Sequence, residues 1–106
     1  MDKVAAVKIV DLFRRGIEAR GIRVKKMILY GSFAAGTSHE GSDIDVVVIS
    51  DDFAGMDYWE RIDVISDVVY ELFAPVEAVA MTSDEWERGE SFVVHYSRNG
   101  EVLFAA

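Results

Sequence analysis

The chain has 106 residues, no cysteine, and 19 acidic against 11 basic residues, which gives a formal net charge of −8. The length predicts one domain spanning residues 1–106, and the lack of cysteine excludes a disulfide framework or a thiolate metal site. The acidic balance argues against nucleic acid as the main ligand, and no apolar run approaches the ~18 residues that span a bilayer, so we expect a soluble, cytoplasmic protein.

The first half of the chain alternates between helical and extended patterns. Its apolar spacing and its Gly, Ser and Thr content predict a helix, a short buried strand, a loop with one helical turn, and a second strand, over residues 3–19, 27–30, 31–42 and 43–50. The second strand is β-branched and fully apolar after Asp45.

The second half predicts an amphipathic helix, a third strand, a capped helical turn and a short final strand, over residues 57–73, 75–81, 83–88 and 101–104. Thr82 or Ser83 is the expected N-cap of the helical turn. Residues 91–98 fit a helix or a strand equally well. The alternation of strands and helices predicts an α/β or α+β fold with three or four strands.

Two carboxylates stand at the start of the second strand. Asp43 and Asp45 point to the same face, about 6–7 Å apart along the strand, and no Lys or Arg lies within that strand. Two ionised carboxylates beside apolar packing repel each other unless a cation lies between them. Mg²⁺ suits such a site, because it binds one or two carboxylates together with substrate phosphate oxygens.

Glu77 is the only charged residue of the third predicted strand. If this strand lies beside the second, Glu77 joins Asp43 and Asp45 and three carboxylates converge. A site of two metal ions ~3.5–4 Å apart needs such a set in order to clamp both oxygens of a phosphoryl displacement.

The Gly31-Ser32 pair follows the first strand and fits the same chemistry. Gly31 lets the backbone approach a ligand closely, and Ser32 is expected to cap the next helical turn, whose free N–H groups attract phosphate. The Ser32 hydroxyl could also donate to a phosphate oxygen. The loop would then hold a triphosphate while the acids hold the metal.

Together these features form the pattern G-S-x10-D-x-D, within YGSFAAGTSHEGSDIDVVVIS at residues 30–50. The segment resembles the minimal nucleotidyltransferases of the DNA polymerase β superfamily, and the order of elements is similar over nearly the whole chain. The resemblance implies the nucleotidyltransferase fold, a small mixed sheet flanked by helices. It also implies two Mg²⁺ ions and transfer of a nucleoside monophosphate from a nucleoside triphosphate.

The resemblance assigns roles to individual residues. Asp43 and Asp45 would bind metal, and Glu77 would take the place of the third family acid, binding metal and helping to activate the acceptor hydroxyl. Gly31, Ser32 and Ser42 would hold the nucleotide.

Small stand-alone domains of this kind are similar to antitoxins whose partner is a HEPN-type toxin. The resemblance therefore implies transfer of AMP from ATP to a hydroxyl group of that protein partner. The sequence leaves the acceptor, the nucleotide and a possible homo-oligomer open.

Two positions depart from the family pattern. Ala35 stands where the family often has arginine, and Glu77 is one methylene longer than the usual aspartate. With the acidic second half of the chain, they favour an alternative hypothesis, a degenerate module that neutralises its partner by binding alone. A third hypothesis, transfer to a nucleic-acid end, conflicts with the charge of −8.

Overall fold

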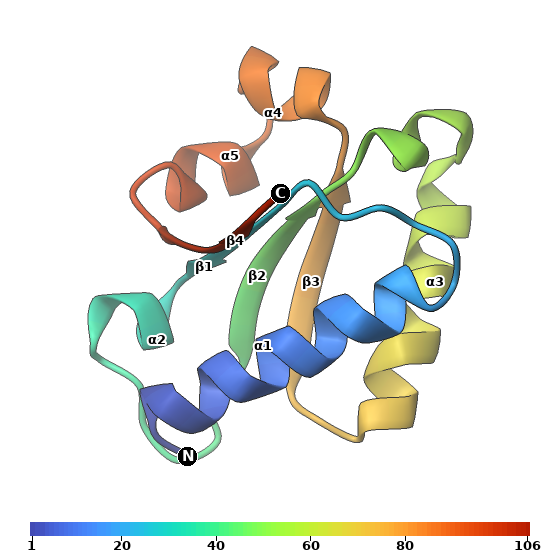
Figure 1. The fold of residues 1–106 in the computed structure, drawn as a ribbon. Helices are drawn as coiled ribbons and strands as arrows, with labels where there is room; N and C mark the ends of the chain where they lie inside the picture. Colours follow the sequence, from blue (N-terminus) through green and yellow to red (C-terminus); the bar gives the residue numbers. More distant parts are fainter.

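The computed structural model describes residues 1–106, and their elements are arranged around one sheet (Figure 1). In chain order they are α1 Lys3–Glu18, β1 Lys26–Tyr30, α2 Ser32–Ala35, β2 Ile44–Ile49, the 3-10 helix η1 Asp51–Gly55, α3 Tyr58–Leu72, β3 Val76–Met81, α4 Ser83–Arg88, α5 Phe92–Ser97 and β4 Glu101–Ala105. No helix is long and apolar enough to cross a membrane.

The four strands form a mixed sheet in the order β3-β2-β1-β4. β1 pairs antiparallel with β2 and β4, whereas β2 and β3 are parallel. Parallel neighbours need a crossover connection, and α3 supplies it between β2 and β3. The predicted mixed sheet of three or four strands flanked by helices is thus confirmed, with four strands.

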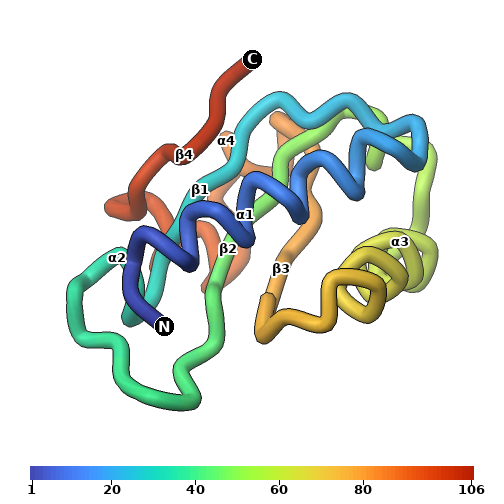
Figure 2. Tube along the Cα trace, turned by 60° about the horizontal axis from the view of Figure 1, so that its bottom comes forward, coloured from blue at the N-terminus to red at the C-terminus, as the bar shows by residue number.

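One face of the sheet carries α1 and α3 and the larger core. α1 begins after Asp2, whose side chain accepts a hydrogen bond from the Ala5 N–H at 2.9 Å. Its buried residues recur at helical spacing and face Val46 and Val48 of β2 in a cluster of 16 buried residues. α3 lies beside β3, at the side of the sheet away from β4 (Figure 2).

The other face carries α5 and a smaller cluster of five buried residues, Ile28, Val47, Ile49, Met81 and Val94. Residues 91–98, which fit either element from sequence, are mainly the helix α5. Ser91 caps it by accepting a hydrogen bond from the Val94 N–H, and the buried Val94 joins the helix to the sheet.

Candidate active site

A row of three polar side chains crosses the sheet at one end of its strands. Asp45 of β2 lies opposite Tyr30 of β1 and beside Glu77 of β3 in the strand register. Residues paired in this way point to the same face, so the side chains of the three residues are neighbours. The assumption that the third strand lies beside the second, on which the predicted site depends, is confirmed.

The electrostatics of this row concentrate on Asp45. Burial, followed by the neighbouring Glu77 and then by the negative charge of Asp43, raises the pKa of Asp45 to about 6. Burial, followed by the charges of Asp45 and Glu77, also raises the pKa of Tyr30. No Lys or Arg forms an ion pair with Asp43, Asp45 or Glu77. The site therefore has an excess of negative charge.

Gly31 makes room for the Asp45 carboxylate. A Cβ atom at residue 31 would lie 2.3 Å from Asp45 Oδ2, far inside van der Waals contact. The backbone of Gly31, with φ 74° and ψ −153°, is also in a region that essentially only glycine adopts. The sequence suggested that Gly31 admits a ligand, and nothing in it revealed that this glycine accommodates the carboxylate on the neighbouring strand.

The prediction that Ser32 caps the helical turn after Gly31 is wrong. Gly31 itself occupies the N-cap position of α2, and Ser32 is the first residue of the helix, with no side-chain capping bond. The half-buried Ser32 hydroxyl makes no hydrogen bond within the protein, whereas its carbonyl accepts one from Thr37 N–H at 2.9 Å. Ser32 keeps a free hydroxyl group and directly follows Gly31, the residue that packs against Asp45.

Ser42 has a structural position in the loop before β2. Its hydroxyl accepts a hydrogen bond from the His39 N–H at 2.9 Å, and its own N–H donates to the His39 carbonyl at 3.0 Å. This turn places the exposed Asp43 directly before the first residue of β2.

The donor set suits a hard divalent cation, although the carboxylates are not gathered into a finished ligand cluster. No group of three or more His, Cys, Asp or Glu side chains lies close enough to hold a metal ion as built. Asp45 and Glu77 are adjacent and Asp43 acts on Asp45 through its charge. Carboxylates without a neighbouring cation are oxygen ligands that Mg²⁺ binds and neutralises.

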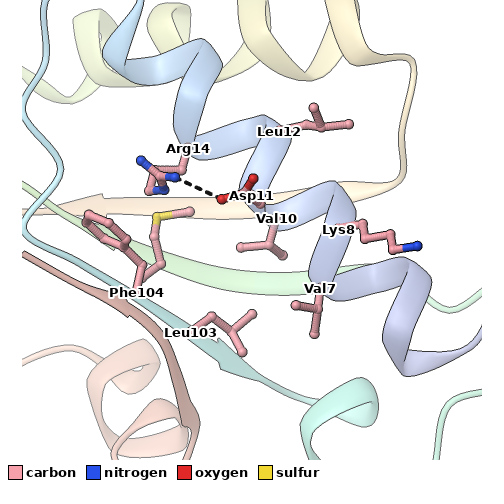
Figure 3. A pocket seen from close by; sticks show the side chains of 9 residues that line it. Val7, Lys8, Val10, Asp11, Leu12, Arg14, Leu103 and Phe104 are labelled. Atoms are coloured by element: carbon pink, nitrogen blue, oxygen red, sulfur yellow. Dashed lines mark hydrogen bonds and ion pairs between the residues drawn. The ribbon is translucent and has the colours of Figure 1, made fainter.

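A separate cavity of about 540 Å³ lies between α1 and β4, at the opposite edge of the sheet (Figure 3). Arg14 closes part of it, 2.8 Å from Asp11 Oδ1 and 4.3 Å from the centroid of the Phe104 ring. None of the predicted site residues lines this cavity. The candidate active site is therefore the carboxylate row and not this apolar cavity.

Comparison with known proteins agrees with the geometry. Residues 10–96 match the family described as "Nucleotidyltransferase domain". A protein of Methanocaldococcus jannaschii named "Putative protein adenylyltransferase" is 27% identical over 84 residues, covering 77% of this chain and 80% of that protein.

Solved structures also share the fold. A putative nucleotidyltransferase from Sulfolobus solfataricus superposes with a TM-score of 0.74 at 14% identity, over 97% of this chain and 83% of that one. A structure described as a toxin-antitoxin with AMP-PNP superposes with a TM-score of 0.62 at 26% identity, over 95% of this chain and 73% of that one.

Proposed function

Because the chain belongs to the nucleotidyltransferase domain family, we propose that it transfers AMP from ATP to a hydroxyl group of a protein partner. One observation carries this proposal, namely that Asp45 and Glu77 lie side by side in the register of β2 and β3, next to the Gly31-Ser32 loop. The relative from Methanocaldococcus jannaschii, named as a protein adenylyltransferase, supports a protein as acceptor.

In the proposed reaction the acceptor hydroxyl oxygen attacks the α-phosphorus of ATP. A new phosphorus–oxygen bond forms, the bond to the bridging oxygen of the β-phosphate breaks, and pyrophosphate leaves. Glu77, exposed at the sheet edge, accepts the proton of the hydroxyl group, while the Ser32 hydroxyl and the Gly31 backbone hold phosphate oxygens. Asp43, Asp45 and Glu77 would hold Mg²⁺, which supplies charge neutralisation at the transferred phosphate.

The proposed partner is a toxin of the HEPN type, and the chain would act as its antitoxin. The resemblance of the G-S-x10-D-x-D segment to stand-alone antitoxin domains motivates this partner. The likeness to a toxin-antitoxin structure that contains AMP-PNP supports both the partner class and an adenine nucleotide.

A second function, neutralising the partner by binding alone, is favoured by the exposed position of Asp43 outside the Asp45–Glu77 pair. The two functions separate in one experiment with α-phosphate-labelled ATP, Mg²⁺ and a purified HEPN-type toxin. Transfer predicts label on the toxin that disappears in Asp45→Asn. Binding alone predicts a stable complex and no label on the toxin, both with the wild-type chain and with Asp45→Asn.

The nucleotide site is tested without an acceptor. ATP and Mg²⁺ at about 100 times the Kd should stabilise the fold by about 2.7 kcal/mol, a melting shift of several degrees. We expect the shift to require both ligands and to vanish in Asp45→Asn. The exposed Asp63→Asn is the matched control and should keep the shift.

A further inference from the structure

We propose that the acceptor hydroxyl reaches the carboxylate row on an extended segment of the partner, basic and apolar in composition, that lies along the open edge of β3. This inference rests on the proposed transfer to a protein hydroxyl and specifies how the acceptor is recognised. Three independent observations support it: the free backbone edge of β3, a groove beside that edge, and the negative charge around that groove.

The edge of β3 is free because its backbone is hydrogen-bonded on one side only. β2 is its sole neighbour in the sheet, and the Ser50 N–H donates to the Met81 carbonyl at 2.9 Å. Backbone groups alternate in direction along a strand, so those of Ala78 and Ala80 point away from β2. No protein group hydrogen-bonds them. An extended chain added at this edge would satisfy them.

A groove runs along the same edge, between β3 and α3. One hollow of about 580 Å³ is lined mainly by apolar side chains and reaches Tyr30 and Glu77. A second hollow of about 450 Å³ shares Ile62, Ile65 and Val79 with the first and continues toward α4. We call the two hollows together the β3 groove. The carboxylate row stands at one end of it, so a chain lying in the groove passes directly beside the proposed base.

The helix that forms one wall of the β3 groove is acidic on its outer side, and Glu77 adds a carboxylate to the lining itself. The solvent side of α3 carries four exposed carboxylates, Glu60, Asp63, Asp67 and Glu71. Of the nearby cations, Arg20 pairs with Glu71 at 2.8 Å and Arg61 with Glu85 at 2.7 Å. The remaining charge complements a segment that contains Lys or Arg. A second copy of this chain, with its own net charge of −8, is a poor match.

Ser66 allows the groove to be filled without disturbing the core, because it lines the first hollow and is exposed. Ser66→Trp places an indole in the β3 groove. Two matched controls are Ser66→Ala, which leaves the groove open, and Asp67→Trp, which places the same ring on the neighbouring outer side of α3. All variants are first checked for an unchanged melting shift with ATP and Mg²⁺.

The probe is a library of nine-residue peptides with a central hydroxyl-bearing residue (Ser, Thr or Tyr) flanked by Lys, Arg, Val, Ile and Leu. Two readouts are taken: label transferred from α-phosphate-labelled ATP, and hydrogen exchange of the Ala78 and Ala80 amides. We expect peptides to slow exchange of both amides by about fivefold or more and to accept label. Both effects should fall about tenfold in Ser66→Trp and stay within about twofold of wild type in the controls.

The outcomes separate this inference from the proposed function. Slowed exchange without label supports the groove and contradicts the transfer. Label without slowed exchange, or label that Ser66→Trp leaves intact, supports the transfer and overturns the groove. If the peptides neither slow exchange nor accept label, both the groove and the transfer are overturned. If the Ala78 and Ala80 amides exchange more slowly at higher protein concentration in the absence of peptide, a second copy of the chain occupies the edge. That result also overturns the proposal.

Discussion

At the scale of single residues, Gly31 couples the loop to the carboxylate on the next strand. Gly31→Ala should lower the free energy of unfolding by about 3 kcal/mol, because it combines a backbone conformation that alanine avoids with a Cβ placed 2.3 Å from Asp45 Oδ2. Urea unfolding measures the change. Gly36→Ala is the matched control, since Gly36 also has positive φ but nothing within 4 Å, and it should cost about 1 kcal/mol. Equal losses in both variants would contradict the close approach to Asp45.

Asp45 makes the unliganded protein less stable as its carboxyl group ionises. Its pKa is about 6 in the folded chain against an ordinary value of 3.8. A raised pKa in the folded state means that stability falls as pH rises from about 4 through about 6 and stays reduced above that range. Asp45→Asn has no such charge, so it should be more stable than wild type by about 1 to 2 kcal/mol at pH near 8, with solvent screening allowed for.

The measurement is urea unfolding across that pH range without divalent cations. The gain in Asp45→Asn should disappear near pH 4, where the wild-type carboxyl group is protonated. Asp63→Asn, which also removes one carboxylate but lies exposed on α3, should show no such pH-dependent gain. A gain in Asp45→Asn that is the same at all pH values would mean that charge repulsion is not its cause.

At the scale of elements, the sequence predicted those whose signals are local. The helix over 3–19 and the helix over 57–73 are visible in their spacing, and Thr82 caps α4 as one of the two expected residues. The sequence left α5 ambiguous because FVVHYS contains two β-branched valines. Its helical conformation depends on the Ser91 cap and on the burial of Val94 against the sheet. The N-cap role was wrongly assigned to Ser32, because Gly31 adopts the N-cap position of α2 instead.

α4 has no buried residue, and Glu85 makes two of the contacts that hold it. Glu85 accepts hydrogen bonds from the Thr82 N–H at 2.7 Å and from Arg61 Nη1 at 2.7 Å. Burial raises the pKa of Glu85, but these bonds outweigh it and the net pKa is lowered. A lowered pKa means that this stabilisation is present above the ordinary pKa and is lost as pH falls through the folded value.

Glu85→Ala should therefore lower the free energy of unfolding by about 2 kcal/mol at neutral pH, because it removes the cap and leaves the guanidinium of Arg61 without its carboxylate. The loss should shrink as pH falls through the lowered pKa of Glu85, where the wild-type carboxyl group becomes protonated. Glu87→Ala, an exposed change on the same helix, is the control and should cost less than about 0.5 kcal/mol. Comparable losses in both would show that helix propensity, and not the Glu85 contacts, holds α4.

At the scale of the whole molecule, the site depends on a relationship between strands that local sequence does not contain. Asp43 and Asp45 were recognisable as a pair from their spacing alone. That Glu77 lies in register with Asp45, and that Tyr30 completes the row, follows from the strand order β3-β2-β1-β4. Strand order is a property of the folded chain and is not contained in any one segment of the sequence. The site residues could therefore be predicted from the sequence, whereas their assembly into one site depended on the assumption that the third strand lies beside the second.

The two cores on either face of the sheet should differ in how they open. Val68 and Val94 are both 1% exposed, but Val68 belongs to the cluster of 16 buried residues under α1 and α3, and Val94 to the cluster of five under α5. We expect Val68→Ala to cost about 2 kcal/mol and to accelerate hydrogen exchange of every amide that needs global unfolding. Val94→Ala should first accelerate the amides of α5 and leave those of β1 and β2 nearly unchanged. If the two variants accelerate the same amides equally, the chain unfolds as one unit. If they differ as expected, α5 opens separately from the sheet face that carries Tyr30, Asp45 and Glu77. Ligands can then reach the site while the main core stays folded.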